Sequence, residues 1–182
     1  MKKFLFLDRD GVINSLIAND RAPRSIKELE IYEDAIFEIP KLFNLGYEVV
    51  VVTNQPDISR GLNTIENVEK INHVIKERIP SISKFFVCYH DNVDVCECRK
   101  PKPGLLLEAI GRTPIDHYYS WMVGDNFTDI TAGAAVGVNT VLLNRVSAKD
   151  SFINHNVVPD YYAKSFTEAS HLITEYFGLT KK

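Results

Sequence analysis

The sequence is poor in cysteine and has no long hydrophobic run. Its three cysteines all lie between positions 88 and 98, which does not match the paired disulfide framework of a small secreted domain. No stretch approaches the roughly 20 apolar residues of a membrane-spanning helix. The first apolar run, residues 4–7, ends at Asp8 and is too short for the core of a signal peptide. We therefore expect a cytoplasmic protein that makes no membrane contact.

Positive charge is also scarce. The 182 residues include 21 Lys and Arg against 24 Asp and Glu, a net charge of −3, so no global basic field attracts nucleic acid. Hydrophobic residues make up 45% and charged residues 25%, a globular rather than a disordered composition. The length suits one domain. We expect a single domain over residues 1–182, a monomer, with a small molecule as its partner.

Short apolar runs alternate with longer amphipathic segments along the chain. Strands are predicted at residues 4–7, 47–52, 85–88, 121–123 and 140–143, and near Tyr161. Apolar residues at helical spacing predict helices at residues 34–45, 64–78, 104–111, 129–135 and 166–177. Alternation of strand and helix favours right-handed crossovers and a mostly parallel sheet. We expect a three-layer, Rossmann-like α/β fold without a large cap domain.

Polar side chains follow four of the predicted strands. Ligands of parallel sheets bind beyond the carboxyl ends of the strands, so these residues form the candidate site. In chain order they are Asp8, Asp10 and Gly11, then Thr53 and Asn54, then Arg99 and Lys100, and finally Asp125 and Asp129. Carboxylates suit a divalent cation, whereas a hydroxyl, an amide and two cations suit a phosphate. The joint placement predicts a site for phosphoryl chemistry.

The same residue types supply the groups that phosphoryl transfer needs. A carboxylate can attack phosphorus and form an aspartyl-phosphate, and Mg²⁺ with a lysine can stabilise the developing charge. A second acid two residues further along an extended backbone projects to the same side, where it can protonate the leaving oxygen and activate water. Plainer interpretations stay open for single residues: Lys100 as a solvated lysine, Asn126 as a helix cap and Asp129 as a helix-start charge.

These residues resemble the four motifs of the haloacid dehalogenase (HAD) superfamily of phosphotransferases. FLDRDGVIN is similar to the first motif, VVVTNQ to the second, the lysine of CRKP to the third and MVGDNFTDI to the fourth. The resemblance covers residues 3–143, in order, and implies the HAD fold. Within the superfamily, DRDGVIN, TNQ…RG, a Cys/His loop and CRKPKPG together resemble the heptose-1,7-bisphosphate 7-phosphatases and the related histidinol-phosphate phosphatases.

The resemblance implies a role for each matching residue. Asp8 would be the nucleophile and Asp10 the general acid/base. The residues implied to steady the phosphoryl group are Thr53, Lys100 and, beside them, Asn54. The implied Mg²⁺ ligands are Asp8, Asp125 and the backbone carbonyl of Asp10. For the remaining part of the substrate we expect contacts from Arg99, Asn126 and either Arg21 or Arg24; at Asn126 the heptose enzymes commonly carry a lysine.

All three cysteines belong to one pattern, Cys88-x-His90-x5-Cys96-x-Cys98. This Cys₃His set suits a tetrahedral zinc ion, and four protein ligands leave no open position, so we expect a structural site. The alternatives are incidental buried cysteines or a catalytic thiol, which no accompanying base supports. The loop leads directly into the Arg99–Lys100 pair, so bound zinc would hold these cations over the phosphate site.

The expected activity is Mg²⁺-dependent hydrolysis of a small phosphate monoester through an aspartyl-phosphate. The resemblance points to the 7-phosphate of D-glycero-D-manno-heptose 1,7-bisphosphate as the leading substrate. The alternatives are a histidinol-phosphate phosphatase or another small phosphomonoesterase, and a non-catalytic zinc-stabilised binding module. A nucleic-acid end phosphatase is disfavoured, because the sequence has a negative net charge and no basic stripe.

Overall fold

A single parallel sheet organises the protein. The computed structural model describes residues 1–18, 20–145 and 157–179. Its strands are β1 (Lys3–Leu7), β2 (Tyr47–Asn54), β3 (Lys84–Cys88), β4 (Trp121–Gly124), β5 (Asn139–Leu143) and β6 (Tyr161–Ala163). They pair in parallel in the order β3-β2-β1-β4-β5-β6. The predicted parallel sheet is confirmed, and its continuity supports our proposal that residues 1–182 form one domain.

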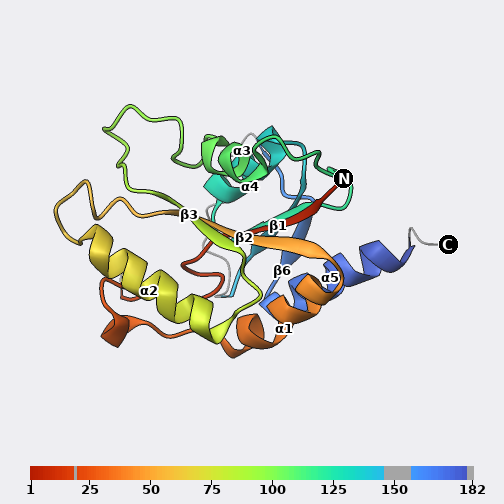
Figure 1. Ribbon diagram of the computed structural model, residues 1–182, viewed down its shortest axis with the longest axis horizontal. Coiled ribbons are helices and arrows are strands. Elements are labelled where there is room, and N and C mark those ends of the chain that lie inside the picture. The colour runs from red at the N-terminus through yellow and green to blue at the C-terminus, as the bar shows by residue number, and fades with distance from the viewer. Residues whose placement is uncertain (19, 146–156, 180–182) are drawn as a thin grey trace.

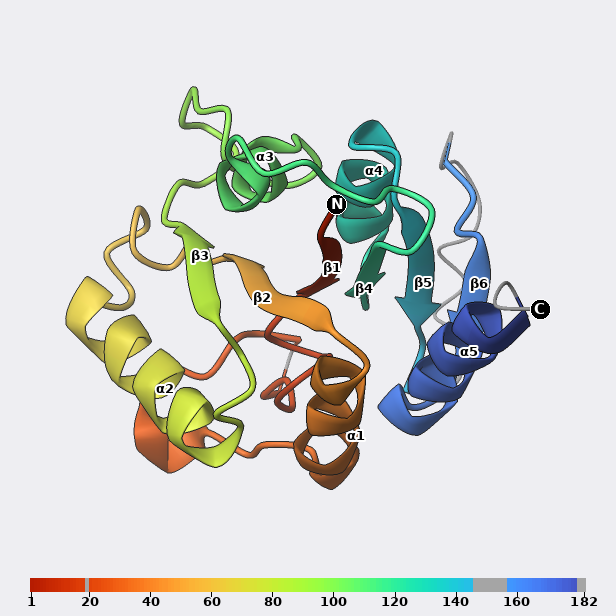
Figure 2. The same ribbon diagram turned by 45° about the vertical axis from the view of Figure 1, so that its right-hand side comes forward.

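Helices cover both faces of this sheet (Figure 1 and Figure 2). One face carries α1 (Glu33–Asn44), α2 (Ile65–Arg78) and α5 (Phe166–Leu179), and the other carries α3 (Gly104–Ile110) and α4 (Phe127–Ala135). Between β1 and α1 the described residues form only one short helix, η1 (Ile26–Glu28), so the described chain has the predicted three layers and no large cap. None of the described helices is long and apolar enough to cross a membrane.

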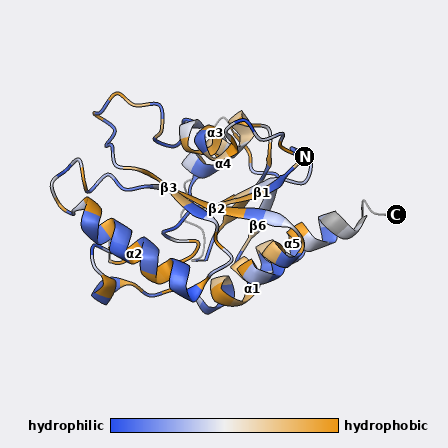
Figure 3. Cartoon of the chain, viewed as in Figure 1, coloured by the Kyte–Doolittle hydropathy of each residue, from blue (hydrophilic) through white to orange (hydrophobic). Residues whose placement is uncertain are grey.

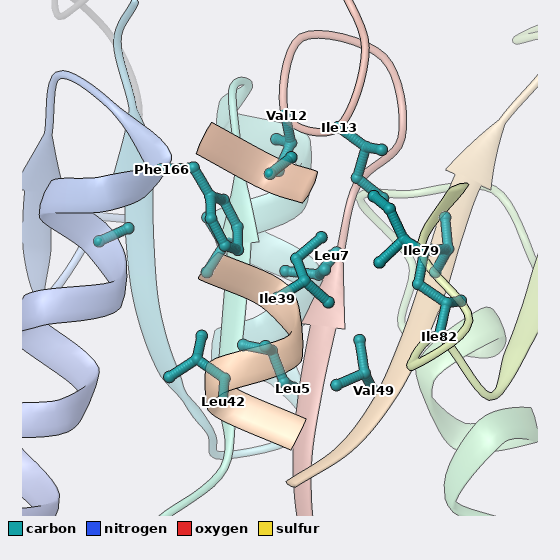
Figure 4. Close-up of a cluster of buried hydrophobic side chains, with 14 of the residues drawn as sticks. Leu5, Leu7, Val12, Ile13, Ile39, Leu42, Val49, Ile79, Ile82 and Phe166 are labelled. Carbon is teal, nitrogen blue, oxygen red and sulfur yellow. The ribbon is translucent and has the colours of Figure 1, made fainter. Parts of the chain in front are cut away.

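A large hydrophobic core lies on each face of the sheet. Leu5 and Leu7 point into the core beneath α1, α2 and α5 (Figure 4), whereas Phe4 and Phe6, stacked at 5.3 Å, point toward α3 and α4. Because both faces are buried, the strands are almost continuously apolar, and the hydropathy colouring shows the same contrast with the polar outer side of α2 (Figure 3). Each buried Leu or Phe contributes about 1.5–3 kcal/mol of transfer free energy.

The second strand is longer than predicted. β2 continues through Thr53 and Asn54 because these residues pair with Val87 and Cys88 of β3. Both candidate phosphate contacts therefore lie on a strand, with ladder hydrogen bonds to fix their backbone, and not in the loop that follows it.

The fourth helix begins two residues before the predicted start. Asn126 caps it, since its Oδ1 accepts the Thr128 N–H at 3.1 Å and its own N–H donates to Asp129 Oδ2 at 3.1 Å. This reciprocal capping box satisfies backbone donors that the first helical turn leaves unpaired. The cap interpretation of Asn126 and the helix-start interpretation of Asp129 are both confirmed.

Candidate active site

Most of the predicted site residues meet at the carboxyl edge of the sheet, around a cavity of about 820 Å³. A cavity of this size accommodates a small metabolite. The predicted residues that line it are Asp8, Asp10, Arg21, Asn54, Arg99, Lys100, Asp125, Asn126 and Asp129. Thr53 is buried on the adjoining strand. Arg24 does not line the cavity either, and its Nε donates to Asp57 at 2.7 Å.

Three carboxylates cluster at the floor of the cavity. Asp8 follows β1, Asp125 follows β4 and Asp129 lies in the first turn of α4; one ligand oxygen from each lies within 4.8 Å of the others. Gly11 has a φ of +85°, and a Cβ there would collide with the Asp125 carboxylate. Glycine is therefore required where the turn after β1 approaches this carboxylate. Such a set of hard oxygen ligands suits a divalent cation.

Burial and mutual repulsion disfavour the ionised forms of these carboxylates. Burial raises the pKa of Asp8 to about 7, with Lys100 offsetting part of the effect and Asp129 and Asp10 adding to it. Burial, together with the charges of Asp8 and Asp129, raises the pKa of Asp125 to about 8. The carboxyl group of a free aspartate has a pKa of about 3.9. A bound dication would supply the missing charge, so the residues present fit a metal site.

Lys100 is the buried cation of the site. Its Nζ lies 2.8 Å from Asp8 Oδ1 and 2.5 Å from Asp129 Oδ1. Burial lowers the pKa of Lys100, but the two acids outweigh it and the pKa is raised, so the ammonium stays charged. Asn54 holds the backbone of Lys100 from β2, with its Nδ2 donating to the carbonyl at 3.0 Å and its Oδ1 accepting the N–H at 3.1 Å. Asn54 thus positions Lys100.

Asp10 is held by three side-chain donors. Arg9 contacts both of its oxygens at 3.0–3.2 Å, Asn14 donates at 2.9 Å and Gln55 at 2.7 Å. The Gln55 amide also donates to Thr53 Oγ1 at 2.9 Å. A single amide therefore links the predicted acid/base to the predicted phosphate contact.

Four residues of this network escaped the sequence analysis. Arg9, Asn14 and Gln55 lie inside the matched motifs, where their polar character was a usable signal. Asn72, which accepts from Arg9 Nη1 at 3.0 Å, is a buried polar residue on the otherwise apolar face of α2. A polar side chain at a core position of a predicted helix requires a buried partner, and that was the signal for Asn72.

The Cys₃His residues also come together. Zn–S bonds of about 2.3 Å place the sulfurs of a tetrahedral site about 3.8 Å apart. Cys88 Sγ lies 3.9 Å from Cys96 Sγ and 3.0 Å from Cys98 Sγ, and His90 Nδ1 lies 3.6 and 3.2 Å from Cys88 and Cys98. Burial and the neighbouring Cys98 raise the pKa of Cys88 to about 12. Four converging ligands of this kind fit a bound zinc ion.

Two arginines on the cavity wall were not predicted. Arg60 lies in the loop after β2 and donates twice to Asp91 of the Cys/His loop, residues 88–98, at 2.7 Å each. Ser59 donates to Asp94 at 2.5 Å, so the loop after β2 holds the Cys/His loop against the wall of the cavity. The second, Arg145, follows β5. Arg60 is the arginine of the matched TNQ…RG pattern but was given no role, and nothing in the local sequence marked Arg145.

The chain is similar to several known proteins. The HAD-hydrolase-like family model matches residues 97–169. The D-glycero-β-D-manno-heptose-1,7-bisphosphate 7-phosphatase of Neisseria meningitidis serogroup A is 34% identical over 157 residues, which are 84% of this chain and 83% of the relative. The corresponding α-anomer phosphatase of Campylobacter jejuni is 35% identical over 151 residues, covering 81% and 86%.

A solved structure agrees with the fold. The crystal structure of a D,D-heptose 1,7-bisphosphate phosphatase from B. bronchiseptica, complexed with magnesium and phosphate, matches with a TM-score of 0.84 at 24% identity, over 95% of this chain and 98% of that chain. The fold, the motif residues and the identity to curated relatives over most of the chain lead to one assignment. This chain belongs to the HAD-type phosphatases and is a phosphoric monoester hydrolase.

Proposed function

We propose that this phosphatase removes the 7-phosphate of D-glycero-D-manno-heptose 1,7-bisphosphate through an aspartyl-phosphate on Asp8. The observation that carries the proposal is the ion pair of Lys100 with Asp8, at 2.8 Å, in a cavity whose wall also carries Arg99. The relatives named as heptose-bisphosphate phosphatases support the substrate. Because their names include both anomers, the proposal does not specify the anomer.

The proposed metal ligands are Asp8, Asp125 and the backbone carbonyl of Asp10. When bound there, Mg²⁺ would withdraw charge from the phosphoryl oxygens. Asp129 is already engaged by Lys100 and by the capping box of α4, so its role is to orient the Lys100 ammonium. The buried acids and their raised pKa values support this assignment.

In the proposed reaction, the Asp8 carboxylate attacks phosphorus in line with the leaving oxygen. The Lys100 ammonium stabilises the negative charge of the phosphoryl oxygens. The Thr53 hydroxyl can donate to the same oxygens, because its own oxygen accepts from Gln55. Asp10 protonates the leaving sugar oxygen and later takes a proton from the attacking water. Arg9, Asn14 and Gln55 hold the Asp10 carboxyl in place for both steps.

Metal binding to this site should depend on pH. The pKa values of Asp8 and Asp125 are raised to about 7 and about 8, so near pH 7 the metal-free pair holds protons that Mg²⁺ must displace. The affinity for Mg²⁺ should therefore rise between pH 6 and pH 8, with release of about one proton. Isothermal titration calorimetry in buffers of different ionisation enthalpy measures both quantities. A constant affinity without proton release would contradict the assignment.

The second phosphate of the substrate would meet the arginine side of the cavity. Among the described residues, the Arg99 guanidinium donates only to neutral oxygens, Oδ1 of Asn92 and the carbonyl of His90. Its charge is thus available to a ligand. Arg60 has its guanidinium on the same wall and is partly neutralised by Asp91. A bidentate guanidinium is well suited to a phosphate group.

The Cys/His loop, with zinc bound, is proposed to hold Arg99 and Lys100 in place. Removing the ion, by chelation or by Cys98→Ala, should loosen residues 88–98 and lower kcat/KM by about 10–100-fold, as removal of an orienting shell does. The Mg²⁺ affinity should persist, because no proposed Mg²⁺ ligand lies in the loop. Zinc content, phosphate release and Mg²⁺ binding are measured on one preparation.

Val95, fully exposed at the tip of the same loop, provides the matched control. Val95→Ala should keep both zinc and activity. Unchanged kinetics after verified zinc loss would contradict the positioning role of the loop.

The substrate itself is tested by comparing phosphate release from both anomers of the heptose bisphosphate with release from histidinol phosphate. We expect kcat/KM for one bisphosphate anomer to exceed that for histidinol phosphate by roughly 100-fold, about 3 kcal/mol for one desolvated charge pair. Arg99→Gln should remove this preference while it leaves a simple monophosphate unaffected. A preference for the amino alcohol ester would reject the sugar substrate but not the phosphatase chemistry.

A further inference from the structure

Arg145 follows β5 at the same edge of the sheet and lines the cavity. None of its hydrogen bonds within the described chain goes to the three clustered carboxylates. Its guanidinium serves the turn after β1 instead. Nε donates to the Gly11 carbonyl at 3.3 Å and Nη2 donates to the Val12 carbonyl at 3.0 Å. Two successive carbonyls of this turn therefore depend on one side chain.

The turn has little freedom to find other donors. Val12 and Ile13 are fully buried and point into the hydrophobic core (Figure 4), and the turn is closed by Ile13 N–H donating to the Arg9 carbonyl at 2.8 Å. Buried carbonyls need a hydrogen-bond donor. Without Arg145, the segment would have to shift to expose its carbonyls or leave them unsatisfied.

A shift of this turn would reach the acid cluster directly. Gly11 lies so close to Asp125 that the space for a Cβ is already occupied by the carboxylate. The preceding carbonyl, of Asp10, belongs to the proposed metal site. A displacement of about 1 Å at reacting groups can cost about 100-fold in rate, so the position of the turn relative to Asp125 should affect the rate of the reaction.

Arg145 is itself held rigidly. Its two Nη atoms bind the Asp34 carboxylate at 2.8 and 2.9 Å, and its guanidinium stacks over the Tyr32 ring at 3.7 Å. Asp34 also accepts the Phe166 N–H at 2.8 Å. The starts of α1 and α5 and the end of β5 are thereby joined at one cation, which is 16% exposed.

We propose that Arg145 is a positioning residue of the phosphatase: it fixes the Gly11–Val12 turn against Asp125 and so sets the geometry of the divalent-metal site. The inference rests on the metal site of the proposed function. The direction of the change in metal affinity distinguishes a positioning role from a purely electrostatic one. Loss of a cation near a metal site should tighten metal binding by charge alone, whereas loss of the turn's support should weaken it.

The test uses Mn²⁺ binding to the substrate-free protein, followed by electron paramagnetic resonance. Arg145→Met should weaken Mn²⁺ binding by about 10–100-fold, the range for residues that orient metal ligands, and hydrogen exchange in residues 9–14 should become faster. Arg145→Lys keeps the charge and one flexible donor, so it should fall between wild type and Met. Arg112→Met, at an exposed arginine after α3, is the matched control and should bind Mn²⁺ as wild type does.

Asp125→Asn distinguishes the two levels of the argument. If it leaves Mn²⁺ binding unchanged, the proposed metal site is wrong and the inference is overturned with it. If Asp125→Asn weakens binding but Arg145→Met binds as tightly as wild type or more tightly, the inference alone is overturned. Should the Met variant fail to fold, Arg145→Lys decides: unchanged Mn²⁺ affinity and unchanged exchange in the turn would reject the positioning role, and weaker affinity with faster exchange would support it.

Discussion

Asp8→Asn should reduce phosphate release by roughly four orders of magnitude or more, the scale of loss when a covalent nucleophile is removed. The amide has nearly the same shape but cannot form an acyl phosphate. Lys100 keeps its second partner, Asp129, at 2.5 Å, so the surroundings of the substituted side chain should persist. Initial-rate assays at saturating Mg²⁺ measure the loss.

The same substitution should not destabilise the metal-free protein. The pKa of Asp8 is raised above its usual value, to about 7, mainly by burial, so the folded state disfavours its ionised form. An acid of this kind lowers stability as the pH rises above its unfolded pKa of about 3.9. At pH 8 the asparagine variant should melt at the same or a higher temperature than wild type. Lost activity together with a large drop in melting temperature would show that the substitution acts through folding, and retained activity would remove Asp8 as the nucleophile.

Lys100→Met should lower kcat by about 10²–10³-fold, the cost of losing one preorganised donor to a developing negative charge. The variant also leaves Asp8 and Asp129 without their shared cation. Removing one partner of a buried ion pair typically costs about 3–5 kcal/mol, so the metal-free variant should melt at a lower temperature. Mg²⁺ should restore part of that loss, because it brings positive charge to the same acids.

The effect on metal affinity makes this prediction specific. Lys100 competes electrostatically with a dication, so Lys100→Met should bind Mg²⁺ at least as tightly as wild type while kcat falls. Lys70→Met, on the exposed side of α2, is the matched control: this lysine pairs with the exposed Glu66 at 2.7 Å and should change stability by no more than about 0.5 kcal/mol. A parallel loss of Mg²⁺ affinity and kcat would indicate that Lys100 acts by supporting the metal site.

Residues that directly follow strands were predictable from the sequence. In a parallel sheet all carboxyl ends lie at one edge, so locating a strand also locates the residue after it. Asp8 and Asp125 meet for this reason. Lys100 is 92 positions from Asp8 and does not directly follow a strand, because β3 ends at Cys88 and the Cys/His loop lies between; its place was indicated by the resemblance to the third motif. The Cys₃His cluster was predictable for a different reason, because its ligands are close in sequence and their residue types have few other uses in combination.

Pairings between a loop residue and a distant segment of the chain were not predictable. Arg145 finds Asp34 across 111 positions and Arg9 finds Asn72 across 63, and no periodicity connects either pair. Arg24 illustrates the same limit, since its partner Asp57 lies on another loop that is distant in the sequence. Side-chain direction in irregular segments depends on long-range packing, which local patterns do not report.

The most direct test of the account is to trap the phosphorylated enzyme. Rapid mixing of protein, Mg²⁺ and heptose bisphosphate, followed by an acid quench, borohydride reduction and peptide mass spectrometry, identifies which carboxyl group carried the phosphoryl group. The account predicts modification at Asp8, absent from Asp8→Asn. A label on Asp10 or Asp125, or full turnover without any labelled carboxyl group, would contradict it.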